Sequence, residues 1–294
     1  MSRSSKARVL IFVLLVALFT AVIQVLNSRH KLGGIGSLVF MWCPAMAALV
    51  ASVITRRSLK VIGWSPRKVQ WIAAGWALPI LYSFVAYGSI WLFGLGGFPN
   101  PRFLQRAPLA MNLAPGHSPT YIIVTAFFFI SVYLLIPSMI SAIGEEIGWR
   151  GFLVPELNNI LGFRGAALLS GAIWAAWHLP AIVFGGYGVE GTPKLYQVAC
   201  FAAMVISSAV LMAWLRMRSG SIWPCVVLHA THNAVIQLFF DAITANTGRT
   251  AYFAGEFGIA LVIPQATLAW YLLRKPSHAA ERNIIPIDPA PTLA

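Results

Sequence analysis

Acidic residues are scarce in this chain. Its 294 residues include only 8 Asp and Glu against 21 Lys and Arg, and charged residues make up 10% of the total. An ordinary globular domain is about a quarter charged. Hydrophobic residues reach 59%, and the mean hydropathy is +0.76. These proportions exclude a disordered chain, a coiled coil and most soluble enzymes, and they indicate a protein embedded in lipid.

Cysteine is also rare, and its placement excludes a disulfide-rich protein. Cys43, Cys200 and Cys225 lie in or beside apolar runs at unrelated spacings. Three cysteines without paired spacing resemble neither a disulfide framework nor a set of metal ligands. We expect them to be buried structural thiols.

The excess of positive charge has a membrane explanation. A net charge of +13 and a pI of about 10.2 would indicate nucleic-acid binding in a soluble protein. Here the Lys and Arg residues lie between long apolar runs, where the positive-inside rule accounts for them. We therefore expect the chain to partner a lipid bilayer and no nucleic acid.

Eight apolar runs are long enough to cross a membrane, since a spanning helix needs about 20 mostly apolar residues. The runs are 8–26, 37–55, 71–96, 121–149, 165–183, 195–215, 221–240 and 254–273, and the fourth reaches Leu157 in its longest form. They lack the alternation that a β-barrel requires. The predicted fold is an all-α polytopic membrane bundle of about eight transmembrane helices, with residues 1–275 as a single membrane domain.

The distribution of basic residues predicts the orientation of this bundle. With the N-terminus inside, 15 of the 21 Lys and Arg residues fall on the inner side and 6 on the outer side. This split predicts N-in and C-in topology in the cell membrane. The first run is too long for a signal peptide and is interpreted as a retained span. Residues 97–119, with five prolines, are expected to form an irregular outer loop, and the tail 276–294 is expected to be a disordered cytosolic segment.

Two adjacent acids interrupt the fourth run. A charge at the membrane centre costs at least about 2.5–3.5 kcal/mol, so an acid there is a functional candidate. Residues four apart on a helix share a face, so Glu146 and Arg150 are predicted to form a supporting ion pair. Glu145 points elsewhere and is expected to have no partner in its own segment. A lone carboxylate in a low dielectric suits a general base that works near neutral pH.

Histidines interrupt the neighbouring runs at related depths. His178 lies one turn after Trp174, and His229 lies one turn before Asn233. At 1.5 Å per residue from the inner helix ends, Glu145, His178 and His229 lie at depths of about 18, 21 and 16 Å. If the three helices are neighbours, these side chains form one site inside the bilayer that is reached from the cytosolic side. The role of His232, three residues after His229, is left open.

These side chains suit hydrolysis by an activated water. Glu145 would take a proton from the water, and His178 would orient it or share the proton. His229 and Asn233 would donate hydrogen bonds to the developing oxyanion. Glu145, His178 and His229 also match a three-ligand zinc set, so Zn²⁺ is an alternative cofactor. The sequence contains neither a His-Glu-x-x-His motif nor a Gly-x-Ser-x-Gly motif.

Three motifs in order resemble one known family. They are two glutamates followed by three residues and an arginine, an aromatic followed by three residues and a histidine, and a histidine followed by three residues and an asparagine. Here they are formed by Glu145, Glu146 and Arg150, by Trp174 and His178 (Trp where Phe is common), and by His229 and Asn233. This pattern resembles the CAAX prenyl protease type II and bacteriocin-processing (CPBP, or Abi) intramembrane proteases over about residues 120–240.

The resemblance implies an eight-helix endopeptidase whose active site opens to the cytosol and whose substrate is a peptide or protein, lipidated or embedded in the membrane. By position it implies a water-activating Glu145 with His178 as its partner, an oxyanion-stabilising or metal-associated His229 and Asn233, and supporting roles for Glu146, Arg150 and Trp174. The family is described both as metallopeptidases and as glutamate-based enzymes, so the need for a metal stays open.

Two other functions stay open at this point. A channel or transporter could use Glu145, His178 and His229 as a proton or cation relay. An internal repeat or paired broken helices would favour it, and neither is evident in the sequence. A membrane scaffold without catalytic activity would keep the motifs for packing alone.

Overall fold

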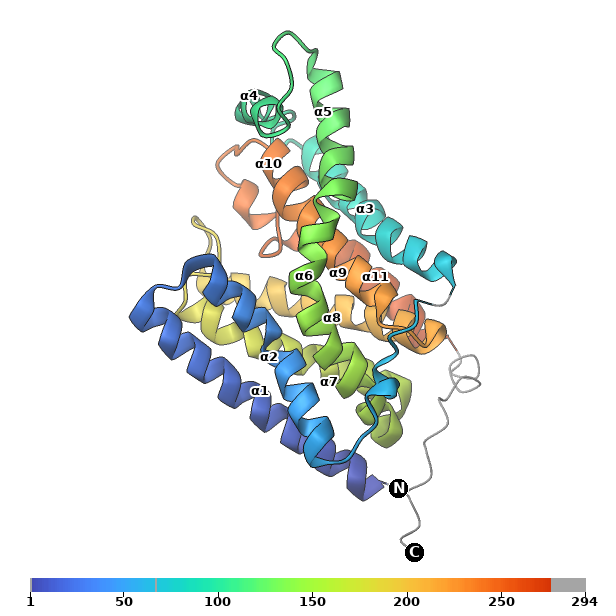
Figure 1. Ribbon diagram of the computed structural model, residues 1–294. Coiled ribbons are helices and arrows are strands. Elements are labelled where there is room, and N and C mark those ends of the chain that lie inside the picture. The colour runs from blue at the N-terminus through green and yellow to red at the C-terminus, as the bar shows by residue number, and fades with distance from the viewer. Residues whose placement is uncertain (1, 67, 276–294) are drawn as a thin grey trace, which may run out of the picture.

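The computed structural model describes residues 2–66 and 68–275, and within them the protein is a bundle of helices without a strand (Figure 1). Six helical stretches in this part of the chain are long and apolar enough to cross a membrane. Two shorter apolar stretches are Pro119–Tyr133 and Ile259–Arg274. The predicted polytopic helical bundle is confirmed, while the count of eight spans and the N-in, C-in topology stay predictions. The predicted disordered tail, 276–294, lies outside the described residues.

The long helices lie close to the predicted runs, and shorter ones lie between them. In chain order they are α1 (Ser2–His30), α2 (Gly33–Ile54), α3 (Val69–Leu92), α4 (Pro101–Ala110), α5 (Pro119–Phe128), α6 (Leu135–Glu146), α7 (Val154–Val183), α8 (Lys194–Ser219), α9 (Trp223–Asn233), α10 (Asp241–Ile243) and α11 (Ile259–Arg274). Three π-helical segments join some of them, namely η2 (Phe129–Tyr133), η3 (Ile147–Leu153) and η4 (Ala234–Phe240). The 3-10 turns η1 (Leu59–Ile62) and η5 (Thr250–Tyr252) lie in connections.

The fourth predicted run takes its longest form. Helical structure continues from Pro119 through α5, α6 and η3 into the first part of α7. Gly162 then interrupts α7 with φ 69° and ψ 178°, a conformation that is costly for residues with a β-carbon. Glu145 therefore lies well inside a long helical rod, and the second part of α7 returns through the bundle with His178.

The predicted irregular loop at 97–119 is partly wrong, because it contains α4. Asn100 caps this helix, its side-chain oxygen accepting a hydrogen bond from the Arg102 N–H at 3.1 Å. Pro101 occupies the first turn, where a missing N–H costs nothing and the fixed φ suits a helix. A proline-rich stretch can therefore begin a helix as well as break one.

The last helix starts later than predicted. The run that begins at 254 is interrupted by Gly255, which has φ 75°, and α11 begins only at Ile259. Glu256 is therefore carried on the turn before the helix. This placement matters for the site described below.

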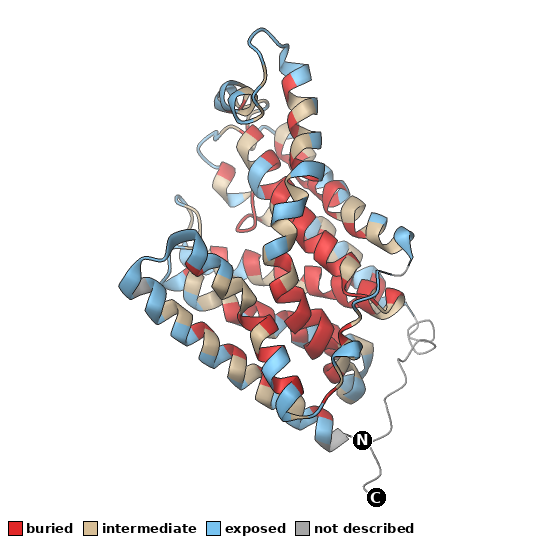
Figure 2. Cartoon of the chain, viewed as in Figure 1, coloured by how far each residue is buried: buried red, intermediate tan, exposed pale blue. Residues whose placement is uncertain are grey.

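Burial is concentrated where α6, η3, α7, α8 and α9 meet, as Figure 2 shows by its red segments. α7 packs along α8, α3 packs along α9, and α6 contacts both α2 and α9. Large apolar side chains on the outside of α1 are exposed, with Leu10 and Leu14 each 60% accessible. Such a face fits contact with lipid tails, so the buried interior is where polar residues need an explanation.

Buried charges tie together the end of the bundle that holds the N-terminus of α1. Glu156 in α7 forms ion pairs with Arg57 at 2.7 Å and with Arg8 at 3.5 Å. Burial lowers the pKa of Arg57 to about 10, although Glu156 beside it acts in the opposite direction, so the guanidinium stays charged at neutral pH. Nearby, Arg216 donates hydrogen bonds to the backbone oxygens of Arg150 and Val61. This end of the bundle is closed by polar contacts.

Candidate active site

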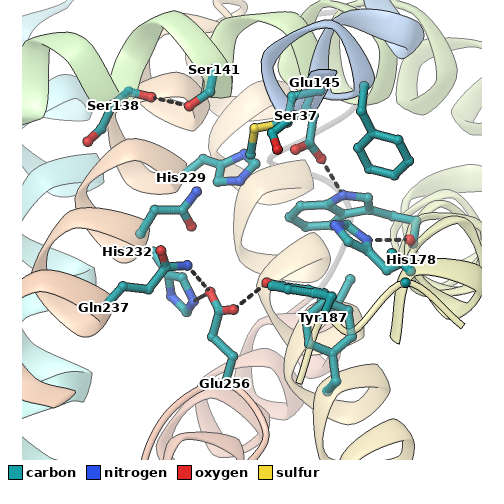
Figure 3. Close-up of a pocket in the computed structure, with 18 of the residues that line it drawn as sticks. Ser37, Ser138, Ser141, Glu145, His178, Tyr187, His229, His232, Gln237 and Glu256 are labelled. Atoms are coloured by element: carbon teal, nitrogen blue, oxygen red, sulfur yellow. Dashed lines mark hydrogen bonds and ion pairs between the residues drawn. The ribbon is translucent and has the colours of Figure 1, made fainter. Parts of the chain in front are cut away.

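A single cavity of about 770 Å³ contains the predicted site residues. It is lined by side chains from α1, α2, α6, α7, α8, α9 and η4, and by Glu256 from the turn before α11. The four predicted catalytic residues all line it, together with Trp174; they are Glu145, His178, His229 and Asn233. Figure 3 shows Glu145, His178 and His229 gathered around this space. The helices that carry the three motifs are thus brought together as the depth argument required.

Indole groups bind only one of the two carboxylate oxygens of Glu145. It is 1% exposed, and its Oε2 accepts hydrogen bonds from Trp174 Nε1 at 2.6 Å and from Trp149 Nε1 at 3.3 Å. The prediction that Glu145 lacks a partner in its own segment is therefore wrong, because Trp149 lies one turn later on the same face. Its other oxygen, Oε1, has no hydrogen-bond partner in the described residues, and the side chain borders the cavity. One carboxylate oxygen is thus oriented and the other is available.

Glu146 takes a different set of partners. Its Oε1 accepts from Arg150 Nη1 at 2.9 Å and lies 2.9 Å from His229 Nδ1. Both Glu146 and Arg150 are buried, at 0% and 1% exposed, and neither lines the cavity. The predicted ion pair is present, and Glu146 holds His229 from behind. A buried acid that has both an Arg and a His partner suits the supporting role expected for it.

The two motif histidines each use Nδ1 for orientation. His178 Nδ1 lies 3.0 Å from the Trp174 carbonyl oxygen, which only accepts, so this nitrogen carries the proton. His229 Nδ1 faces the Glu146 carboxylate in the same way. The Nε2 atom of each ring is therefore the one without a printed partner. In neutral His178 this Nε2 atom is a hydrogen-bond acceptor and a base.

Trp174 is the side chain that joins the three motifs. Besides its N–H bond to Glu145, its ring lies edge-on to His229, with 5.3 Å between centroids. The guanidinium of Arg150 lies 4.2 Å from the Trp174 ring centroid, a cation–π contact. A phenylalanine at this position would keep the ring contacts and lose the N–H donor.

Asn233 and His232 separate in the structure. Asn233 is half-buried and lines the cavity, and no hydrogen bond of its side chain is present in the described part of the chain. His232 also lines the cavity but has different partners: its Nδ1 lies 2.6 Å from the Tyr82 hydroxyl and its Nε2 lies 3.5 Å from Glu256 Oε1. His232 thus belongs to a second polar cluster.

Close approach of α2 to α6 and η3 explains two glycines beside the paired glutamates. A β-carbon on Gly144 would lie 2.8 Å from the Met41 backbone oxygen, and one on Gly148 would lie 2.5 Å from Pro44 Cβ. Only glycine permits this approach. It places Phe40 and Met41 on the cavity wall, next to the helix that carries Glu145.

The predicted zinc ligands do not form a ligand set as they are arranged. Among the described residues, no group of three or more His, Cys, Asp or Glu side chains is placed to hold a metal ion. One Glu145 oxygen already accepts two indole N–H bonds. The chemistry of the site is therefore derived below from its side chains alone.

Among the cavity residues that the sequence did not predict, three polar ones form a cluster: Tyr187, Gln237 and Glu256. Tyr187 Oη donates to Glu256 Oε2 at 2.5 Å, and Gln237 Nε2 donates to Glu256 Oε1 at 3.1 Å. One signal was available, because Glu256 is one of only 8 acids and lies at the start of an apolar run. No sequence pattern links it to the motifs, since its partners come from distant segments.

Several of the residues that line the cavity lie near one end of the bundle. Its lining includes Asn27 near the end of α1, Ser37 near the start of α2, and Phe184 after α7. These positions lie at the end opposite the N-terminus of α1, which Figure 1 shows at the lower right, while the connection of α1 to α2 is at the upper left. With the termini inside, this cavity would open toward the outer side. Access to this cavity from the cytosol is therefore incompatible with N-in topology.

Comparison with known proteins agrees with the motifs. Residues 126–235, which include all three motifs, match the family described as Type II CAAX prenyl endopeptidase Rce1-like. A curated protein, CAAX prenyl protease 2 from Methanococcus maripaludis, is 27% identical over 122 residues. The aligned stretch covers 40% of this chain and 44% of that relative, so the similarity spans less than half of either protein.

Proposed function

We propose that this chain is a member of the CPBP family and acts as an intramembrane endopeptidase that hydrolyses a peptide bond with a glutamate-activated water. The observation that carries this proposal is that only one of the two carboxylate oxygens of Glu145 has hydrogen-bond partners. One of its oxygens accepts two indole N–H bonds, and the other is free beside the cavity that His178 and His229 also line. A carboxylate that is oriented but not neutralised by a cation keeps its capacity to accept a proton.

The proposed reaction begins with a water bound between Glu145 Oε1 and His178 Nε2. Glu145 takes one proton from this water as the water oxygen attacks the carbonyl carbon of the substrate. His178 Nε2 accepts a hydrogen bond from the remaining O–H, which stays on the oxygen, and so fixes the direction of attack. The attack forms a tetrahedral intermediate with a negatively charged oxygen. Glu145 then gives the proton to the amide nitrogen, the carbon–nitrogen bond breaks, and an acid and an amine are released.

We assign stabilisation of the oxyanion to His229 and Asn233. The Asn233 amide has no internal partner in the described structure and lines the cavity, so its N–H is available to donate. His229 donates from Nε2 in its imidazolium form, because Nδ1–H is already directed at Glu146. The Glu146 carboxylate, which also accepts a hydrogen bond from Arg150, stabilises that imidazolium. Two donors of this kind are each worth about 10²–10³ in rate.

The proposed substrate class is a peptide or protein that enters the membrane. Aromatic and aliphatic side chains, among them Phe40, Phe184 and Phe201, line much of the cavity. Such a lining suits an apolar peptide or an attached lipid chain. The relative's name, CAAX prenyl protease 2, makes a prenylated C-terminal peptide the first substrate to try.

The test compares cleavage of a quenched prenylated CAAX peptide and of its unprenylated form by purified protein in detergent. We expect Glu145→Gln to lower kcat by about 10²–10⁴, the usual contribution of a general base, while the protein stays folded. Glu190→Gln is the matched control, because it removes the same charge from an exposed position outside the cavity. Each variant is also assayed with and without a strong zinc chelator.

The outcomes separate the alternatives. Full activity of Glu145→Gln would refute the proposed mechanism. Loss of wild-type activity with the chelator, restored by zinc, would replace the glutamate-activated water with a metal-bound one. If neither peptide is cleaved, proton flux into liposomes that depends on Glu145 would favour the relay function.

A further inference from the structure

The cavity contains a second carboxylate that the proposed reaction does not use. Glu256 is 7% exposed and lines the same cavity as Glu145. In Figure 3 the two lie at opposite ends of the cluster, with His178 and His229 drawn between them. Glu256 also lies outside residues 126–235, the stretch that matches the family.

Two neutral hydrogen-bond donors and one histidine surround the Glu256 carboxylate. Tyr187 donates to Oε2 at 2.5 Å, and Gln237 donates to Oε1 at 3.1 Å. Burial, and then the Glu256 carboxylate beside it, raise the pKa of Tyr187 well above its ordinary value, so the phenol keeps its proton and donates. His232 Nε2 lies 3.5 Å from Oε1, longer than a good hydrogen bond, and its other nitrogen contacts Tyr82. These partners orient the carboxylate without supplying a fixed positive charge.

Two other buried acids in this protein have arginine partners. Glu146 pairs with Arg150, and Glu156 pairs with Arg57 and Arg8. No Lys or Arg lines the cavity in the described part of the chain, whereas two glutamates do. Buried carboxylates are normally paired with a cation, since an uncompensated charge in a low dielectric is costly. Three histidines also line the cavity, but His229 already faces the Glu146 carboxylate, so a positively charged guest would compensate the two glutamates better than the lining itself does.

We propose that Glu256, oriented by Tyr187 and Gln237, is a specificity subsite that binds an ammonium or guanidinium group of the peptide substrate. This inference rests on the proposed peptidase function. A peptide whose scissile bond lies at Glu145 places a basic side chain, or its free N-terminal amine, at the far end of the same cavity. The subsite selects among peptides by charge, and the apolar lining accepts the remainder of the peptide.

The test measures binding, so that it does not depend on cleavage. The protein carries Glu145→Gln to prevent hydrolysis, and the probes are apolar nonapeptides with a fluorescent group at the C-terminus. Each position in turn is lysine or norleucine, a neutral side chain of similar length, and each peptide has a free or an acetylated N-terminus. Fluorescence anisotropy in detergent at low salt gives Kd for each peptide.

We expect one lysine position, or the free N-terminus, to bind at least about tenfold more tightly than its neutral match, as a desolvated charge pair requires. The peptide that binds more tightly shows whether the cation is a lysine side chain or the N-terminal amine. Adding Glu256→Gln is expected to reduce the ratio to about one. Glu190→Gln, an equal charge change at an exposed position, is expected to leave the ratio unchanged.

A charge preference that is absent, or that persists in Glu256→Gln, would overturn the proposal and leave His232 as the counter-ion of Glu256. If Glu256→Gln does not fold, Glu256→Asp decides, because it keeps the charge and withdraws it by one methylene. An unchanged ratio in that variant also overturns the proposal. If the peptides bind with a charge preference but the protein with native Glu145 cleaves none of them, the subsite is retained and the peptidase function is refuted. If the protein cleaves peptides but shows no charge preference, the subsite alone is refuted.

Discussion

At the scale of single residues, Glu145 and Glu146 are neighbours in the chain with different surroundings. Helix geometry alone predicts that Glu146 meets Arg150, and the 2.9 Å contact confirms it. The same spacing also places Trp149 beside Glu145, so this partner too follows from helix geometry. The shorter bond, from Trp174, joins residues 29 positions apart and depends on how the two helices pack.

We predict that Trp174→Phe lowers kcat by about tenfold or more with little change in KM. The variant keeps the aromatic contacts with His229 and Arg150 and removes the 2.6 Å hydrogen bond that orients Glu145. A hydrogen bond to a charged group is worth about 1.5–3 kcal/mol. The measurement is steady-state kinetics on whichever peptide the wild-type protein cleaves.

Trp149→Phe is the matched control, because it removes an equally buried indole whose bond to Glu145 is longer, at 3.3 Å. It is expected to have the smaller effect on kcat. Equal effects of the two substitutions would mean that loss of packing, and not the Trp174 N–H, lowers the rate.

At the scale of helices, the site depends on α2, although no motif lies in it. α2 reaches the rod that carries Glu145 only because Gly144 and Gly148 lack side chains. The apolar pattern of α2 predicts a span and says nothing of which helix it contacts. Its wall residues, Ser37, Phe40 and Met41, could therefore not be assigned to the site from the sequence.

We predict that Gly148→Ala destabilises the protein by about 1–3 kcal/mol, the usual cost of overpacking. The new β-carbon would lie 2.5 Å from Pro44 Cβ and 2.7 Å from the Pro44 backbone, so α2 has to move. Activity is expected to fall as well, because α2 forms part of the cavity wall. Thermal unfolding in detergent, with cleavage assays below the transition, measures both effects.

Gly88→Ala provides the comparison for this change. Gly88 lies inside α3, and a β-carbon there would have nothing within 4 Å. Alanine favours helix over glycine by about 1 kcal/mol, so this variant is expected to be as stable as wild type or more so. If Gly148→Ala behaves like Gly88→Ala, the close approach of α2 does not constrain the site.

At the scale of the whole molecule, orientation decides which compartment reaches the cavity. The positive-inside rule places the N-terminus in the cytosol, and the cavity is lined from the opposite end of the bundle. The end near the N-terminus is closed by Glu156, Arg57 and Arg216. Access from the cytosol through this cavity would require the inverted orientation.

We predict from the distribution of charge that Glu190→Cys reacts with a membrane-impermeant maleimide in intact cells, whereas Lys60→Cys reacts only after permeabilisation. Both positions are exposed, and they lie in connections at opposite ends of the bundle. The native Cys43, Cys200 and Cys225 are buried, so background labelling is expected to be low. The reverse labelling pattern would contradict the N-in topology and place the mouth of the cavity in the cytosol.

By itself, the sequence determined the class of fold and the members of the main site. Long apolar runs in a chain with few charges leave a helical membrane bundle as the stable solution, because backbone groups in lipid must bond within their own segment. The cost of burying charge singled out Glu145, Glu146 and the intramembrane histidines, and these all lie in or directly behind one cavity.

Only the tertiary structure decided how the site is held and which end it faces. The indole of Trp174 on Glu145, the Glu146 contact with His229, and the cluster of Tyr187, Gln237 and Glu256 join segments far apart in the chain. Such contacts depend on which helices become neighbours and on side-chain direction, and helical periodicity specifies neither. Turns such as the one at Gly255 shift a residue out of its predicted helix for the same reason, since packing outside the run determines where the helix begins.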